Sequence, residues 1–178
     1  MPDFFDVIKK RQSIRKFKEK EISDNMLNQI IDAARLAPSA MNTQPWDFVI
    51  VKDRALRKEI RKVYDNAREA LKLYKQDTAF VESGMIIVVC SHSDAPRHVI
   101  STSLAVENMV LAATALNLGS VIMTAPFSRR EDREEIRELL KIPEAYDLLA
   151  LVAIGHSDEE PQKKPKRDPG EITHINEF

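Results

Sequence analysis

Residues 101–125 read STSLAVENMVLAATALNLGSVIMTA, and this stretch decides the fold. Residues 101–118 predict a helix that is apolar on most of its circumference and ends at Gly119, and residues 120–125 predict a strand. A helix that is hydrophobic nearly all round is buried on all sides. In a chain of 178 residues, burial on all sides indicates a partner subunit in addition to the chain's own core.

Helices and strands alternate along the rest of the chain. Ser23 caps a helix that Pro38 ends, and Ser128 with Glu131 makes a capping box for a helix that runs through Leu140. The remaining predicted elements are helices at 3–10 and 54–76 and strands at 47–53, 84–91 and 148–155. This alternation predicts a mixed α and β layer fold in a single domain over residues 1–178.

Composition excludes several functional classes. The formal net charge of −1 gives no global electrostatic reason to bind nucleic acid or a membrane. No apolar run approaches the roughly 20 residues of a membrane span, and the first ten residues lack the apolar region of a signal peptide. Cys90 is the only cysteine, which excludes an intramolecular disulfide framework and favours a reducing, cytoplasmic location.

The common catalytic motifs are absent. The four glycines form neither a dinucleotide-binding fingerprint nor a phosphate-binding loop, and there is no nucleophile elbow. The four histidines lack metal-binding spacing, so no metal site is expected. If the protein is an enzyme, its reactive atoms therefore come from a cofactor.

A basic segment, KKRQSIRKFKEK at residues 9–20, is the first positive signal. In an extended segment, Arg11, Ser13 and Arg15 share one face because alternate side chains point the same way. Two guanidinium groups and a hydroxyl suit a phosphate dianion, and each charged hydrogen bond contributes roughly 1.5–3 kcal/mol. The alternative is a solvated helix end, because cations also favour a helix C-terminus.

Two further stretches need a function. The loop PSAMNTQPW at residues 38–46 is rich in turn formers, and its simplest explanation is a helix-to-strand turn with Trp46 in the core. The segment KKPKRDPGEITHI at 163–175 has the composition of a disordered tail. However, the apolar Ile172 and Ile175 indicate docking, and we expect the tail at 157–178 to dock at a cofactor site or on a partner subunit.

Five motifs occur together in one order: RQSIRKF, APSAMNTQPWDFVIVKD, AVENMVLAATALNLGSVIMTAPF, IPEAY…LVAIGH and KRDP. In this order the chain resembles the short branch of the nitroreductase family of FMN-dependent oxidoreductases. The likeness covers almost the whole chain and is weakest over residues 54–82. It implies an α+β three-layer fold, in which helices flank a central, mostly antiparallel sheet. It also implies an intertwined homodimer with FMN sites at the interface.

The resemblance implies a role for each unusual stretch. Arg11, Ser13 and Arg15 would hold FMN from its phosphate to its pyrimidine ring, and the loop at 38–46 would meet the flavin of the other subunit. The family more often has serine at Ala40. The implied cofactor-binding residues are Arg11, Gln12, Ser13, Arg15, Pro38, Ser39, Ala40, Asn42, Gln44, Thr124, Ala125, Lys164 and Arg167. Lys166 competes with Lys164 for the role of the phosphate-binding lysine beside Arg167.

The implied reaction is ping-pong. NADH or NADPH reduces FMN at N5 and leaves, and a nitroaromatic, quinone or similar small acceptor is then reduced in its place. No catalytic side chain is expected, and Phe127 is expected to shape the acceptor pocket. Residues 54–82 are expected to cover it.

Two alternatives stay open at this stage. One is a reductive dehalogenase resembling iodotyrosine deiodinase, which has a hydroxyl residue where this chain has Ala125. Such an enzyme also has a lid with a Glu, Tyr and Lys set, and Glu69, Tyr74 and Lys75 lie in the matching region. The other alternative is a protein that binds or stores flavin without turnover.

Overall fold

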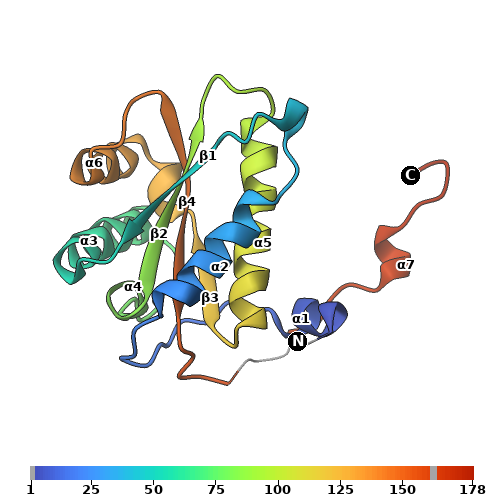
Figure 1. Cartoon of the computed structure of the whole chain (residues 1–178), viewed down its shortest axis with the longest axis horizontal. Coiled ribbons are helices and arrows are strands. Elements are labelled where there is room, and N and C mark those ends of the chain that lie inside the picture. Colours follow the sequence, from blue (N-terminus) through green and yellow to red (C-terminus); the bar gives the residue numbers. More distant parts are fainter. Residues whose placement is uncertain (1–2, 161–163) are drawn as a thin grey trace.

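A single antiparallel sheet forms the centre of the computed structural model, which describes residues 3–160 and 164–178 (Figure 1). Its strands lie in the order β1-β2-β4-β3. Their bounds are Trp46–Val51 for β1, Met85–His92 for β2, Gly119–Met123 for β3 and Tyr146–Gly155 for β4. All neighbouring pairs are antiparallel, and the register shifts between Val89 and Cys90, where β2 pairs with β4.

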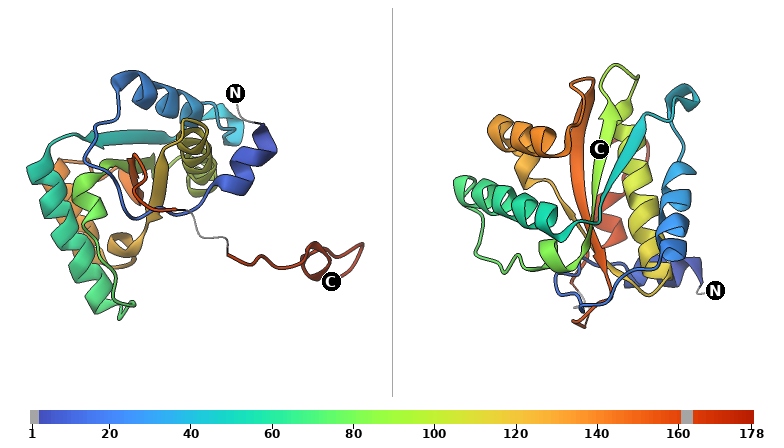
Figure 2. Two further views of the ribbon diagram at one scale, coloured as in Figure 1. Left: turned by 90° about the horizontal axis from the view of Figure 1, so that it is seen from below. Right: turned by 60° about the vertical axis from the view of Figure 1, so that its left-hand side comes forward.

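Helices cover both faces of the sheet, so the predicted three-layer α+β fold is confirmed (Figures 1 and 2). One layer contains α1 (Phe4–Lys10), α2 (Asp24–Arg35) and α5 (His98–Ala115). The other contains α3 (Arg54–Ala70), α4 (Phe80–Ser83) and α6 (Arg130–Leu140). The short turns η1 (Ala40–Asn42) and η2 (Ala125–Ser128) and the helix α7 (Pro169–Ile172) complete the order.

The central strand β2 explains why two cores form. Ile86 and Val88 face the core beneath α3 and α6, whereas Ile87 and Val89 face the core beneath α2 and α5. A strand buried on both faces has a continuous apolar sequence because neither set of alternate side chains meets water. The apolar run that predicts a central strand at 84–91 is therefore explained by the two helical layers.

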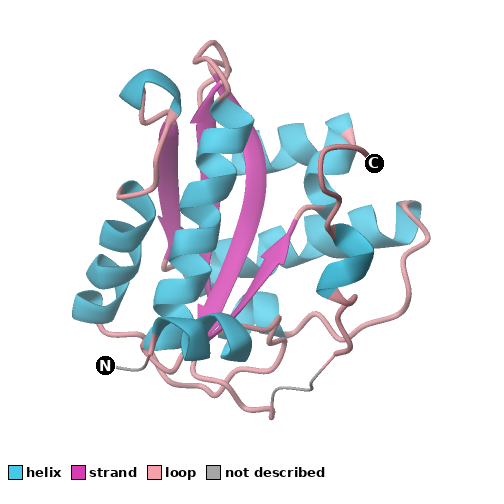
Figure 3. Ribbon diagram, turned by 90° about the vertical axis from the view of Figure 1, so that its right-hand side faces the viewer, coloured by secondary structure: helices cyan, strands magenta, loops and turns pink. Residues whose placement is uncertain are grey.

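Helix α5 packs against α2, the sheet and α1 (Figure 3). One apolar stripe of its side chains stays uncovered. Ile100 and Leu104 are exposed on successive turns, Leu111 is half-buried further along, and Glu107 lies between them. These residues follow the helical spacing of three to four, so they share one face. Across the part of the chain that the structure describes, no helix combines the length and apolar character that crossing a bilayer requires.

Several predicted element bounds are wrong. Helix α5 begins at His98 rather than residue 101, and α3 ends at Ala70 rather than residue 76, where Lys72 turns the chain into the left-handed region at φ 53°. The expected capping box does not form. Ser128 lies in η2, so Arg129 takes the N-cap position of α6 and provides no side-chain cap.

The apolar side chains of the basic segment pack directly against three glycines. A Cβ on Gly119 would lie 2.6 Å from Cγ2 of Ile14, and one on Gly155 would lie 2.7 Å from Cγ of Phe17. A Cβ on Gly84 would also meet the Phe17 ring, at 2.9 Å. Ile14 and Phe17 are both buried, so these glycines are required for close packing rather than for an unusual backbone angle.

We predict that Gly155→Ala destabilises the protein by about 1–3 kcal/mol, the usual cost of overpacking a core. The new methyl group would push Phe17, and with it the basic segment, away from the sheet. Urea denaturation measures the change, with Gly170→Ala as the matched control, because a Cβ there meets only Asp168 Oδ1 at 3.2 Å. Wild-type stability of Gly155→Ala would contradict this packing.

Candidate functional site

The basic segment is extended and is hydrogen-bonded to β3 and to the residue that follows β4. The backbone N–H of Ile14 donates to Ser120 O of β3 at 2.9 Å, and the N–H of Lys18 donates to His156 O at 2.9 Å. Ser13 also forms a parallel bridge with Ser120. The buried Ile14 faces inward, whereas Ser13 is exposed and Arg11 and Arg15 are half-buried. The alternation seen in the sequence is thus present in the structure.

A cavity of about 170 Å³ lies at this segment. Its lining consists of Gln12, Ser13, Ile14, Arg15, Glu159, Glu160 and Lys164. Among the residues that the structure describes, the Arg15 guanidinium has no carboxylate partner, while Nε of Arg11 lies 3.9 Å from Oε1 of Glu107. The fold therefore brings together one group of the predicted site residues, from both ends of the chain.

Two cavity residues were missed by the sequence analysis, Glu159 and Glu160. Oε1 of Glu159 accepts a hydrogen bond from the backbone N–H of Arg15 at 2.5 Å. The acidic pair follows the predicted strand at 148–155 after three intervening residues, and its charge is opposite to that of the basic segment. That complementarity is a sequence signal, but only the fold shows that the two stretches meet.

The loop at 38–46 has a strained but well-anchored backbone. Met41, Asn42 and Gln44 have positive φ angles of 51°, 53° and 46°. Ser39 Oγ accepts from the N–H of Gln44 at 2.9 Å, and the N–H of Ala40 donates to Ser101 Oγ at 3.3 Å. Left-handed conformations of non-glycine residues concentrate at functional sites.

Trp46 shows how the loop ends. It is the first residue of β1, is only 8% exposed and packs in the core beneath α2 and α5. The expectation that it lies in the core is confirmed. The loop is consequently held at two points. Trp46 anchors its end in the core, and Ala40 is bonded to Ser101 in the first turn of α5.

The two groups of predicted residues lie at different ends of α5 in one chain (Figure 1). The loop contacts Ser101 in the first turns of α5, whereas the basic segment contacts Ser120, beyond its last turn. At a rise of about 1.5 Å per residue, the helix between Ser101 and Ala115 spans roughly 20 Å. One chain therefore does not bring the two groups together.

The remaining predicted residues lie apart as well. Thr124 is exposed and Ala125 is buried, just past the end of β3 that lies away from the basic segment. Phe127 is buried in the core beneath α3 and α6, and its role in shaping an acceptor pocket stays a prediction. Packing against α3 explains its position.

The tail leaves the body of the chain after the cavity. Lys164 lines the cavity, whereas Lys166 does not. Arg167 does not line it; its Nη2 donates to Glu171 O at 2.9 Å within the tail. Figure 2 shows α7 apart from the sheet and its helices, and every residue of 164–178 is exposed.

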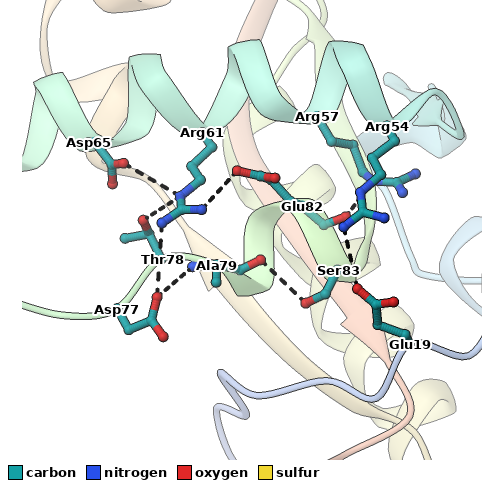
Figure 4. A network of polar contacts seen from close by, with 10 residues as sticks. All are labelled: Glu19, Arg54, Arg57, Arg61, Asp65, Asp77, Thr78, Ala79, Glu82 and Ser83. Atoms are coloured by element: carbon teal, nitrogen blue, oxygen red, sulfur yellow. Dashed lines mark hydrogen bonds and ion pairs between the residues drawn. The ribbon is translucent and has the colours of Figure 1, made fainter.

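Polar contacts hold the segment 71–83 against α3 (Figure 4). Arg61 Nη1 pairs with Glu82 Oε1 at 2.8 Å, and Arg61 Nε donates to Thr78 Oγ1 at 3.0 Å. Nη2 of Arg68 donates to the backbone oxygen of Tyr74 at 2.6 Å. The segment is thereby fastened to the layer opposite α5.

The three residues that match a deiodinase lid do not form a set here. Glu69, Tyr74 and Lys75 are exposed, and the Tyr74 hydroxyl donates to Gln76 Oε1 at 3.0 Å. Within the described ranges no hydrogen bond or ion pair joins the three to one another. The sequence match therefore has no structural counterpart in this chain alone.

A larger cavity of about 690 Å³ lies between residues 19–24 and the start of α3. It contains as many carboxylates as cations, namely Glu19, Glu21, Asp24 and Glu82 against Lys20, Lys52, Arg54 and Arg57. Burial lowers the pKa of the Arg57 guanidinium, with a further contribution from Arg54. None of the predicted site residues lines this cavity, so we place the candidate site at the smaller one, which Gln12, Ser13, Arg15 and Lys164 line.

Redox or metal chemistry by side chains finds no support in the described residues. Cys90 is buried, and burial raises the pKa of its thiol to about 12, so it stays a protonated thiol. Over residues 3–160 and 164–178 no group of three or more metal-ligating side chains is close enough to hold an ion. The lining of the site supplies cations, a hydroxyl and two carboxylates.

The sequence model of the nitroreductase family matches residues 8–156, and the chain belongs to this family. A protein of Archaeoglobus fulgidus with the provisional name NADH dehydrogenase/NAD(P)H nitroreductase is 33% identical, with 90% of this chain and 88% of the relative covered. An iodotyrosine deiodinase of Thermotoga neapolitana is 32% identical, with both chains fully covered. A crystal structure of oxidized iodotyrosine deiodinase bound to FMN and 3-iodo-L-tyrosine superposes with a TM-score of 0.89 at 28% identity, covering 99% and 100% of the chains.

Proposed function

We propose that this protein is an FMN-dependent oxidoreductase that uses NADH or NADPH to reduce nitroaromatics, quinones or similar acceptors. The observation that carries the proposal is the outward face of Arg11, Ser13 and Arg15, which the sheet holds in an extended conformation. Family membership supports it, and the FMN in the deiodinase structure supports the choice of cofactor.

The residues present fit FMN in their chemistry. Guanidinium groups and a hydroxyl match the phosphate, and Ser120, which pairs with Ser13, has a buried Oγ without a partner among the described residues. The cavity of about 170 Å³ is smaller than the roughly 300–1,000 Å³ of typical cofactor pockets. One chain therefore supplies part of a site, and the rest has to come from elsewhere.

A second copy of the chain is the proposed source. The loop at 38–46 is strained, is exposed at residues 41–44 and lies about one helix length from the basic segment, so it can serve a partner's site but not its own. The uncovered stripe on α5 gives the two copies an apolar surface to share. Ile172, Ile175 and Phe178 are exposed in the tail, which suits docking on the partner.

Bound FMN would accept two electrons from the nicotinamide donor and pass them to the acceptor. The protein's part is binding and electrostatics. Arg15 would lie at the pyrimidine end and stabilise negative charge on the reduced flavin. Arg11 and Ser13 would hold the phosphate. The backbone at Thr124 and Ala125, beyond β3, would face the reacting edge.

A deiodinase is the second candidate because that relative and that structure cover the whole chain. Against it stands the methyl group of Ala125, where a hydroxyl is expected. In addition, no hydrogen bond or ion pair joins Glu69, Tyr74 and Lys75 within the described residues. These features favour the broader reductase function.

The proposed function is tested first by colour and turnover. The purified protein is expected to be yellow, to release FMN on denaturation and to oxidise NADH or NADPH when a nitroaromatic or quinone is added. Iodide release from 3-iodo-L-tyrosine by the reduced protein would favour the deiodinase instead. Protein that binds FMN without any turnover would be a carrier, and colourless protein that FMN cannot reconstitute excludes all three.

We predict a dimer that buries at least about 2,000 Å² in total. Leu104→Glu should weaken the dimer and FMN binding together, because it places a charge in the apolar stripe of α5. Leu71→Glu is the matched control, since Leu71 is an exposed apolar residue at the end of α3 in the other layer. Sedimentation velocity measures the result, and a flavin-loaded monomer of the wild-type protein would contradict it.

We predict that Arg15→Ala lowers both FMN affinity and the flavin midpoint potential, whereas Arg11→Ala mainly lowers affinity. The potential falls because a cation near N1 favours the reduced, anionic flavin, and a coupling of 1.4 kcal/mol corresponds to about 30 mV. Spectroelectrochemistry at saturating FMN separates potential from occupancy. If the potential is unchanged in both variants, Arg15 does not lie at the pyrimidine end.

A further inference from the structure

The carboxylate of Glu159 lies inside the proposed cofactor site. Its Oε1 accepts from the backbone N–H of Arg15 at 2.5 Å, and both residues line the cavity of about 170 Å³. Glu159 is half-buried, whereas its neighbour Glu160 is exposed. A negative charge thus stands where a phosphate dianion and a reduced flavin would bring more negative charge.

The contact leaves the arginine charge available. Glu159 takes the backbone N–H of Arg15, and among the described residues no ion pair joins its carboxylate to the guanidinium. Around the cavity, Arg15 and Lys164 face Glu159 and Glu160, so the lining charges of the described residues balance. The carboxylates therefore weaken the positive potential of the cavity, although no direct ion pair joins Glu159 to the Arg15 guanidinium among the described residues.

A hydrogen-bonded turn holds Glu159 in this position. Ser157 Oγ donates to Glu159 O at 2.7 Å, and the N–H of Glu159 donates back to Ser157 Oγ at 3.3 Å. The N–H of Asp158 donates to Lys16 O at 2.9 Å, which ties the turn to the basic segment. Glu159 is consequently a built part of the cavity wall.

We propose that Glu159 sets the cofactor affinity and the flavin potential below the values that Arg11 and Arg15 alone would produce. This inference rests on the proposed function. Charges in a partly buried cavity interact more strongly and are screened less than charges in water. The Glu159 carboxylate therefore opposes the phosphate of the cofactor and, more strongly, the extra negative charge that reduction adds.

Glu159→Gln isolates this charge because a glutamine oxygen can still accept from the N–H of Arg15. We expect FMN to bind about three- to tenfold more tightly to the variant than to the wild-type protein. The gain should be about threefold larger for reduced than for oxidised FMN, which raises the midpoint potential by about 14 mV at 29.6 mV per tenfold. The shift is opposite in sign to that expected for Arg15→Ala.

The matched control is Asp158→Asn, which removes the same charge one residue away. Asp158 is exposed and does not line the cavity, and its contact with Lys16 is made by the backbone. We expect its FMN affinity and potential to match the wild-type values. Glu159→Ala provides a second test: it removes both the charge and the acceptor, so its potential should rise while its affinity gains less than that of Glu159→Gln.

Fluorescence titration of the apoprotein with FMN and spectroelectrochemistry at saturating FMN provide the two readouts. Tighter binding and a higher potential in Glu159→Gln, with Asp158→Asn unchanged, support the inference. Unchanged values in Glu159→Gln, weaker binding, or equal shifts in Asp158→Asn overturn it while the proposed function stands. Wild-type protein that binds no FMN overturns the proposed function and this inference with it.

Discussion

The seating of Ile14 and Phe17 against three glycines is the packing on which the candidate site depends. Gly119, Gly155 and Gly84 leave no room for a Cβ, so two large apolar side chains can reach the sheet between flanking charges. Their burial turns the alternate residues of the same segment outward. A basic stretch that would otherwise be a solvated loop becomes a rigid row of cations beside β3.

Helix α5 links this row to the other half of the site. Its N-terminal turns anchor the strained loop through Ser101, and the chain past its C-terminal end pairs with the basic segment through Ser120. The helix is too long for one flavin to touch both ends in one chain. The same helix leaves an apolar stripe uncovered. A two-copy assembly would explain both features. The partner would cover the apolar stripe, and the loop of each copy would meet the basic segment of the other.

Positive and negative side chains line the same cavity. Cations suited to a phosphate and to an anionic flavin share the wall with Glu159, whose hydrogen bond to the Arg15 backbone keeps the segment in place. Proteins similar to this chain carry names ranging from nitroreductase to deiodinase. In such a family, the residues that line a shared cofactor cavity are a direct physical means of setting how readily the flavin is reduced.

The sequence by itself determined the layers, because apolar periodicity and length distinguish a strand buried on both faces from an amphipathic helix. It also determined the outward face of Arg11, Ser13 and Arg15, because alternation is a local property of an extended chain. It did not determine the end of α3, the cap of α6 or the burial of Phe127, which depend on contacts between distant residues. Only the tertiary structure placed Glu159 on Arg15 and separated the loop from the basic segment, since both facts follow from where the sheet brings remote stretches of chain.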